Sequence, residues 1–505
     1  MRAALTWMAC GLLLCAAASA GAQSAAKGVE ADGTTALHRA VYAGDLPQAQ
    51  QLIAAGADVR AVNRFGANAM QLAAVRGDAA LLRALLKAGA DVDSTTAEGQ
   101  TALMAVARTG NVEAAQVLLK AGASLHAREN WGGQTALMWA AAQSQPDMIR
   151  LLVSRGARVN ERSTVRDWQR RVTAEGRPKD MYRGGLTPLL FAAREGCMPC
   201  IEVLLKARAD INLADPDGTT PLIMALLNVH WDTALHLIER GADIQQWDRY
   251  GQTPLYVAVD LNTLPIGRRV ELPADDVNTG EDLVRVLLQR GANANAQLKL
   301  RPRYRNIPND RYMDPLIVWG TTPLLRAAKA GDVPVLKLLL QHGALANLAN
   351  AQGVTPLMVA VGDGHIHDPT RGRFRTEEDA LQCYDLLRAA GADADARTLL
   401  GYADADLKII TAANRTAVHA AASRGWNTVV KRLVADGAKL DVIDSNGLSA
   451  IDYALGRFRK EFNAKQPEQY TDTVALLRQL GASAENPTAT FAPSSVPRIT
   501  AVVPQ

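Results

Sequence analysis

A short segment recurs along this chain at a nearly fixed distance, and this repetition constrains the fold more than any other feature of the sequence. Most copies read Thr, then Pro or Ala, then Leu, as in Thr101-Ala102-Leu103 and Thr322-Pro323-Leu324. The copies begin at Thr35, Asn68, Thr101, Thr135, Thr187, Thr220, Thr253, Thr322, Thr355, Thr416 and Ser449. Most intervals are 33 or 34 residues, and three are longer, at 52, 69 and 61. A unit of this length, repeated many times, predicts a stacked array rather than one globular core.

Each unit predicts two short helices. A Thr hydroxyl accepts hydrogen bonds from first-turn amides and caps a helix, and Pro is tolerated at the position that follows. Small pairs such as Ala192-Ala193 allow a second helix to approach closely. Farther along comes Leu-Leu and then Gly-Ala, as in Leu118-Leu119 and Gly122-Ala123, where Gly can adopt the left-handed conformation that ends a helix. Arg208 stands where the other copies have this Gly.

These motifs resemble those of the ankyrin repeat family. The resemblance covers roughly residues 31–482 in about eleven copies, although only His38 and His419 keep the His of the family tetrapeptide. It implies an all-α solenoid of helix-turn-helix repeats joined by finger loops, with long insertions. It also implies recognition of another protein by fingers and inner helices along a long concave face, without a catalytic step.

The two ends of the sequence predict segments outside the array. Arg2 is the only charge before Lys27, an apolar run follows it, and Ala20-Gly21-Ala22 has the small-x-small form of a cleavage site. We therefore expect a signal peptide at 1–22 with cleavage near Ala22 and Gln23, a linker at 23–30, and a periplasmic or secreted protein. Residues 483–505 are rich in Pro, Ser, Thr and Ala and predict a flexible tail. No other stretch is long and apolar enough to predict a membrane span.

Insertions interrupt the period at two kinds of position. Those at 161–183, 296–318 and 397–413 fall between repeats, where fingers lie, and those at 261–280, 362–378 and 456–470 fall between the two helices of one repeat. The first two finger insertions mix Arg with aromatic residues, which can grip an anionic partner. Their partner-binding candidates are Arg166, Trp168, Arg170 and Arg171 in the first, and Arg301, Arg303, Tyr304 and Arg305 in the second. The alternatives are a merely solvated loop or a site for an anionic envelope glycan.

Three aromatic residues at other finger positions are further contact candidates. Trp131, Trp247 and Tyr250 are expected to be exposed there. Cys197-Met198-Pro199-Cys200 begins a second helix, with Cys197 at an exposed turn position and Cys200 at a core position. The pair could be inert thiols, a structural disulfide or a thiol-redox site.

Charge and motif content limit the remaining function classes. Lys and Arg total 55 and Asp and Glu total 51, so the formal net charge is only +4, which excludes a nucleic-acid coat. The sequence has no nucleophile elbow, phosphate-binding Gly loop or H-E-x-x-H motif. We therefore predict no enzyme, no cofactor or metal site, and a monomer that binds another protein with an acidic surface.

Overall fold

The computed structural model describes residues 29–166, 171–172, 178–179, 183–262, 276–300, 317–362, 376–399, 412–457 and 469–486. Within these ranges it contains 22 α-helices, which pair in chain order into eleven repeats, as the sequence predicts. The first helices of the pairs are α1 (Ala36–Ala43), α3 (Ala69–Arg76), α5 (Ala102–Thr109), α7 (Ala136–Ala142), α9 (Pro188–Arg194), α11 (Pro221–Leu227), α13 (Pro254–Asn262), α15 (Pro323–Ala330), α17 (Pro356–Ala360), α19 (Ala417–Ala422) and α21 (Ala450–Ala454). The second helices are α2 (Leu46–Ala54), α4 (Ala79–Lys87), α6 (Val112–Lys120), α8 (Pro146–Ser154), α10 (Met198–Lys206), α12 (Trp231–Glu239), α14 (Gly280–Gln289), α16 (Val333–Gln341), α18 (Glu377–Ala389), α20 (Asn427–Ala435) and α22 (Thr471–Gln479).

The predicted capping residues lie directly before the first helices. The hydroxyl of Thr101 accepts a hydrogen bond from the Met104 amide at 3.3 Å, and the side chain of Asn68 accepts one from Gln71 at 2.9 Å. First-turn amides have no partner inside a helix, so these caps fix where each first helix begins.

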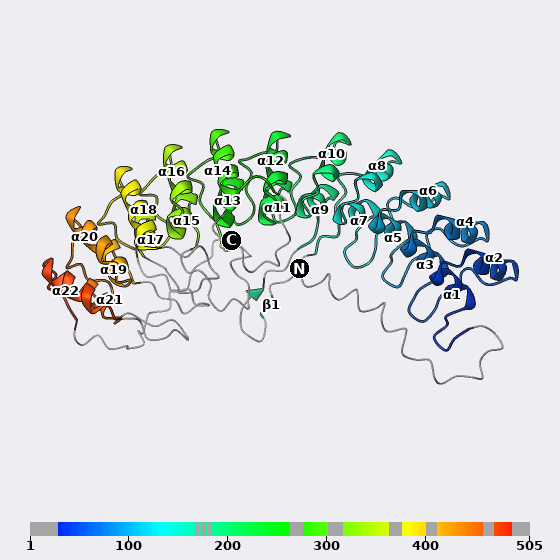
Figure 1. Cartoon of the computed structure of the whole chain (residues 1–505), viewed down its shortest axis with the longest axis horizontal. Helices are drawn as coiled ribbons and strands as arrows, with labels where there is room; N and C mark the ends of the chain where they lie inside the picture. The colour runs from blue at the N-terminus through cyan, green and yellow to red at the C-terminus, as the bar shows by residue number, and fades with distance from the viewer. Residues whose placement is uncertain are drawn as a thin grey trace. The chain divides into compact units, whose positions relative to one another are not determined.

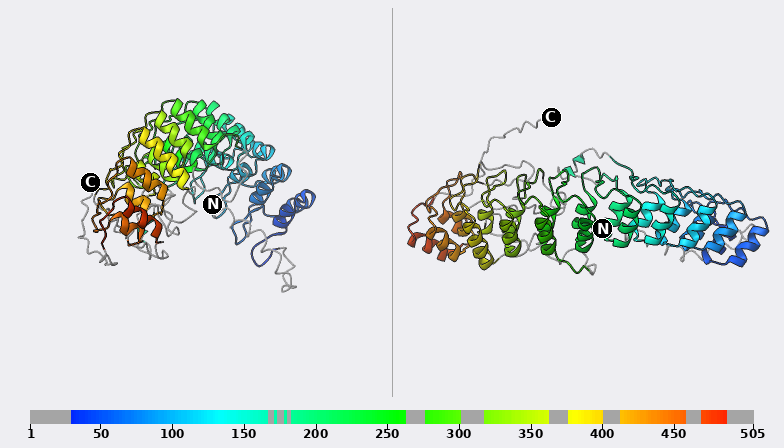
Figure 2. Two further views of the ribbon diagram at one scale, coloured as in Figure 1. Left: turned by 60° about the vertical axis from the view of Figure 1, so that its left-hand side comes forward. Right: turned by 90° about the horizontal axis from the view of Figure 1, so that it is seen from above.

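The chain forms two compact units. The first comprises residues 1–164, 186–192 and 199–209, and the second comprises 165–185, 193–198 and 210–505. In the first unit, α1, α3, α5 and α7 pack in one layer and α2, α4, α6 and α8 in another (Figure 1). In the second unit, the odd-numbered helices α11 to α21 and the even-numbered helices α12 to α22 repeat this arrangement. The left view of Figure 2 shows the helix pairs of this unit, coloured from green to red. Each repeat therefore contacts mainly its neighbours.

Fingers connect successive helix pairs and are closed by short polar side chains. In the first one, Asn63 Oδ1 accepts hydrogen bonds from the amides of Phe65 and Ala67 at 3.1 and 2.9 Å. Neighbouring fingers are joined through their backbones, as where the Arg64 amide donates to the Asp32 carbonyl at 2.8 Å. Backbone hydrogen bonds therefore join several pairs of neighbouring fingers within a unit.

The first finger insertion adds a short strand pair to the predicted all-α array. Val165 and Gly184 form an antiparallel bridge, and beyond it β1 (Arg171–Val172) pairs antiparallel with β2 (Pro178–Lys179). The Arg166 amide also donates to the Arg183 carbonyl at 2.7 Å. This insertion thus extends a finger as a short hairpin, which helix periodicity alone does not predict.

The described chain continues beyond the predicted end of the array at 482. Asp441 Oδ1 accepts hydrogen bonds from the amides of Ser483 and Ala484 at 2.8 and 2.9 Å, and Arg457 pairs with Glu485 at 3.1 Å. The last repeat therefore includes residues up to Asn486, and the rest of the predicted tail lies outside the described residues. The predicted signal peptide also lies outside them. Among the described helices, none is long and apolar enough to cross a membrane.

Replacing Arg208 by Gly should raise the free energy of unfolding by about 0.5–1 kcal/mol. Arg208 has a φ of 65° just after α10, a conformation that side chains disfavour. The equivalent Gly56 and Gly89 both have a φ of 87°. Urea denaturation measures the change, and Arg208→Ala is the control because Ala keeps the strained conformation. An equal gain from both substitutions would show that backbone strain is not the cause.

Candidate functional site

In the first two repeats, the first helix has two positions that are at least partly exposed, four and seven residues after the capping residue. In α1 these are Arg39 and Tyr42, and in α3 they are Leu72 and Val75. Tyr42 is 59% exposed and Val75 is 52% exposed. The two positions are three residues apart and therefore share one face of each helix. We call this the first-helix face.

In much of the second unit, one of the two positions of this face is buried. From α13 onward, the residues four positions after the cap are all buried; they are Val257, Arg326, Val359, Ala420 and Tyr453. Recognition of a partner along one long concave face, which the sequence predicts, stays a prediction. These inner-helix residues pack inside the chain, so they offer no free surface.

Arg326, the one charged residue in this set, forms a buried ion pair. Arg326 on α15 donates from Nε to Asp260 Oδ1 on α13, and their side chains are 2% and 0% exposed. Beside them, Asn262 donates to Asp332 Oδ2 at 2.8 Å, and Asp332 also caps α16. These polar groups bind one another across neighbouring repeats, which indicates a structural role.

The three predicted finger aromatics differ in exposure. Trp131 is 77% exposed and Trp247 is 48% exposed, but Tyr250 is only 6% exposed. The prediction for Tyr250 is wrong because the next finger covers it: the amides of Lys299 and Leu300 both donate to the Tyr250 carbonyl. Lys299 Nζ lies 3.1 Å from the centre of the Trp247 ring, a cation–π arrangement that holds this Trp at the finger surface.

Sequence reasoning missed two exposed aromatics at other fingers. Phe65 is 62% exposed and Trp319 is 43% exposed. Both stand next to the Gly that turns a finger, Gly66 and Gly320. Trp131 is likewise followed by a glycine, Gly132, but so is the buried Tyr250, so this sequence context alone does not predict exposure.

The basic insertions are only partly within the described residues. Arg166 lies at the base of the first hairpin and is partly exposed. Arg171 opens β1, opposite Lys179 in register. Trp168 and Arg170 lie outside the described residues, as do Arg301, Arg303, Tyr304 and Arg305 in the second insertion.

Comparison with known protein families shows which family this chain belongs to. The family model described as ankyrin repeats (3 copies) matches residues 8–96, 70–163, 189–269 and 274–367, and the single ankyrin repeat model matches 413–445. The chain belongs to the ankyrin repeat family. An array of these repeats indicates a scaffold for protein–protein interaction, and the fold is typically a non-enzymatic binding scaffold.

The ankyrin array is similar to parts of several curated proteins. It is 30% identical over 232 residues to the B-cell lymphoma 3 protein homolog of Mus musculus, covering 45% of this chain and 40% of that protein. It is 27% identical over 198 residues to ankyrin repeat protein nuc-2 of Neurospora crassa, covering 36% and 17%. The chain thus spans less than half the length of these relatives.

One solved structure is also similar to this chain. The crystal structure of the ankyrin repeat domain of Bcl-3 is 25% identical in sequence and has a TM-score of 0.37. The match covers 45% of this chain and 94% of that one.

The C-x-x-C pair of the fifth ankyrin repeat is buried. Cys197 and Cys200 are both disulfide-bonded, and they are 8% and 0% exposed. Cys197 was expected at an exposed turn, and that expectation is wrong. The next repeat closes over this loop, where Thr233 Oγ1 donates to the Gly196 carbonyl at 3.1 Å. Redox catalysis needs an accessible sulfur, so the burial argues against the thiol-redox alternative.

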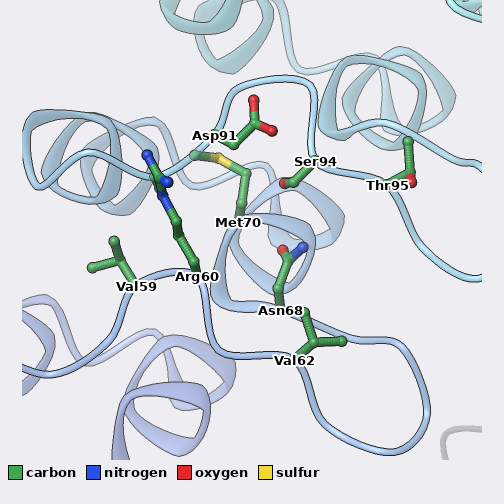
Figure 3. Close-up of a pocket in the computed structure, with 9 residues that line it drawn as sticks. Val59, Arg60, Val62, Asn68, Met70, Asp91, Ser94 and Thr95 are labelled. Atoms are coloured by element: carbon green, nitrogen blue, oxygen red, sulfur yellow. The ribbon is translucent and has the colours of Figure 1, made fainter.

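A cavity of about 350 Å³ lies between the loops that follow α2 and α4 (Figure 3). Its lining includes Val59, Arg60, Asn68, Met70 and Asp91. Arg60 and Asp91 are its only charged residues, and Arg60 Nε donates to the Gly89 carbonyl at 3.1 Å. Across the described residues, no group of three or more His, Cys, Asp or Glu side chains is placed to hold a metal ion. The cavity therefore offers no constellation for catalysis.

One finger carboxyl has a strongly shifted pKa. The pKa of Asp248 is raised to about 7, chiefly by burial. The charges of Asp215 and Asp217 on the preceding finger also raise this pKa, and the hydrogen bonds that Asp248 accepts lower it. Asp248 Oδ1 accepts from the amides of Tyr250 and Gln252, both at 2.9 Å. Because the folded chain holds a proton on Asp248 that the unfolded chain releases, the contribution of Asp248 to folding stability should fall as pH rises from about 4 to 7.

Asp248→Asn should remove this dependence. Asn63 and Asn350 occupy the same position in other fingers and accept the same pair of backbone hydrogen bonds. At pH 8 the variant should be more stable to urea by about 1–3 kcal/mol, while at pH 4 the two proteins should be nearly equal. Chemical denaturation across this pH range measures the difference. If the free energy of unfolding depends on pH in the same way for both proteins, ionisation of Asp248 does not destabilise the folded chain.

Proposed function

We propose that this ankyrin-repeat chain is exported and binds another protein that has an acidic surface, without a catalytic step. The observation that supports the proposal is the first finger insertion, which leaves a hydrogen-bonded finger edge as an antiparallel hairpin carrying Arg166 and Arg171. A hairpin held at its base loses less conformational freedom on binding than a loose loop, and so is suited to recognition.

The positive charge of the finger insertions favours a partner with an acidic surface. The second insertion contains Arg301, Arg303, Arg305 and Arg311 against only Asp310 and Asp314. The planar fork of Arg matches a carboxylate in two parallel hydrogen bonds. Charges of this kind at the rim of an interface chiefly speed encounter with an oppositely charged surface.

Capture from cell envelope extracts tests protein binding against glycan binding. The immobilised mature chain should retain a protein at about 50 mM salt and release it at about 500 mM, because exposed charges are screened. Treating the extract with protease should abolish capture, while digesting its glycans should not. Retention of an anionic glycan from a protease-treated extract would instead establish the glycan-binding alternative.

The export proposal predicts a processed N-terminus. Arg2, the apolar run and Ala20-Gly21-Ala22 direct cleavage before Gln23. N-terminal sequencing of the purified protein should find Gln23, and the protein should fractionate outside the cytoplasm. Recovery of Met1 on a cytoplasmic protein would refute export and leave the binding proposal standing.

A further inference from the structure

We infer that the cavity between the loops that follow α2 and α4 is a binding site for a small zwitterion with an apolar side chain, such as a free amino acid. Its polar groups are Arg60, Asp91 and Ser94, and the rest of its wall is largely apolar. This inference goes beyond the proposed function, because the ligand is a small molecule and the site lies outside the basic insertions.

Arg60 occupies a position that joins neighbouring repeats elsewhere in the array. The position lies four residues after the residue that ends the second helix, which is Gly in most repeats. In many repeats an Asn, Asp or Gln side chain stands there and accepts a hydrogen bond from a backbone amide of the next repeat, at 2.8–3.3 Å. The amides that donate in this way include those of Ser124, Asp243, Asn293, Leu345, Asp393, Lys439 and Ser483.

Arg60 can make only the donor half of this pattern. Its Nε donates to the Gly89 carbonyl at 3.1 Å, as Asn295 Nδ2 donates to the Gly343 carbonyl at 2.9 Å. A guanidinium has no acceptor atom, so it cannot accept from the Asp91 amide, which the pattern places beside it. Among the described residues, no group accepts a hydrogen bond from this amide or from the terminal nitrogens of Arg60.

These donors define one half of the ligand. A guanidinium matches a carboxylate in two parallel hydrogen bonds, and the Asp91 amide adds a third donor beside it. Ser94 Oγ is buried at the same cavity and has no hydrogen-bond partner in the described chain. Figure 3 shows Arg60 extending from the loop after α2, and Asp91 and Ser94 from the loop after α4. A ligand carboxylate would take the place of the side-chain oxygen that other repeats supply.

The Asp91 carboxylate defines the charge of the other half. Its Oδ1 accepts from the Asp93 amide at 3.0 Å, whereas its Oδ2 has no hydrogen-bond or ion-pair partner among the described residues. Arg60 and Asp91 are the only charged residues of the lining, so a ligand that was purely anionic would leave this carboxylate uncompensated. An ammonium group on the ligand supplies the missing partner.

The remaining lining and the size of the cavity define the ligand side chain. Val59, Val62, Met70 and Ala90 provide apolar contact. The volume of about 350 Å³ is near the lower end of the range for small-molecule sites, roughly 300–1,000 Å³. The cavity therefore suits an amino acid or a dipeptide rather than a larger molecule.

Ligand-observed saturation-transfer NMR of the full mature chain with L-leucine tests the inference. Titration to about 10 mM covers dissociation constants up to about 1 mM, which corresponds to weak binding. L-leucine should bind. L-leucinamide, which lacks the carboxylate, and N-acetyl-L-leucine, which lacks the ammonium group, should each bind at least tenfold more weakly. No binding of L-leucine, or equal binding of either analogue, overturns the inference.

Two variants locate the binding, and a third is the control. Arg60→Asn should weaken binding at least tenfold and leave the thermal midpoint unchanged or higher, because Asn295 makes both backbone hydrogen bonds at this position. Asp91→Asn should weaken binding similarly and keep its turn, since Asn293 accepts the same turn hydrogen bond at 2.9 Å. Arg83→Asn removes the same charge from a side chain that is 55% exposed on α4, and should bind as the parent does. Equal binding by Arg60→Asn and its parent, or equal loss in Arg83→Asn, would show that L-leucine does not bind in this cavity.

Discussion

Replacing Arg326 by Ala should lower the free energy of unfolding by about 3–5 kcal/mol. The substitution leaves the Asp260 carboxylate buried without its partner between α13 and α15, where both side chains are at most 2% exposed. A buried charge that loses its ion-pair partner is costly, because burial also removes it from water. Urea denaturation followed by far-UV circular dichroism measures the loss.

The paired variant Asp260→Leu, Arg326→Leu is the control for this prediction. It removes both charges, and apolar residues already occupy the position of Arg326 in α13 and α17, as Val257 and Val359. Its cost should be much smaller than that of Arg326→Ala, since replacing a whole buried ion pair by apolar residues is often neutral. If the single and paired variants lose the same stability, lost packing rather than the stranded carboxylate is the cause.

Reversing Arg301, Arg303 and Arg305 to Glu should slow association with the envelope partner by about tenfold or more at low salt. Three rim charges that attract an acidic surface would then repel it, and the difference should shrink as salt screens them. Thermal stability should change little, because exposed charges contribute little to folding. Stopped-flow or biosensor measurements at several ionic strengths provide the association rates.

A matched triple variant checks that the effect is local. Arg83, Arg150 and Arg432 lie on the second helices α4, α8 and α20, and their side chains are 55%, 63% and 52% exposed. Reversing all three makes the same change in net charge but away from the fingers. This control should associate nearly as fast as the parent. Equal slowing by both variants would mean that net charge alone, and not the second insertion, steers the partner.

The repeat fold could be predicted because its determinants are local. Thr101 caps a helix three residues before the amide that it bonds, and Gly122 ends one through its own backbone conformation. Such signals recur in each unit, so the number of helix pairs and the positions of the insertions followed from spacing alone. The left-handed conformation of Arg208 is likewise a property of one residue in one repeat.

The surface was harder to predict because burial depends on residues of the neighbouring repeat. Tyr250 and Cys197 both stand at turn positions, yet the next finger or helix pair covers each of them. The same applies to Arg326, whose partner lies 66 residues away on α13. A periodic pattern shows where a side chain stands within its repeat, but the exposure of that side chain is decided by the neighbouring repeat that packs against it.

Photo-crosslinking in intact cells tests the account of an exported, protein-binding array most directly. A photo-reactive amino acid in place of Trp131, which is 77% exposed at its finger, would react with whatever binds there. The same group at Arg83, on the second-helix layer, is the control. The account predicts that Trp131 yields a covalent adduct with one protein located outside the cytoplasm and having an acidic surface, and that Arg83 does not. An adduct with glycan alone, with a cytoplasmic protein, or equally from both positions would contradict it.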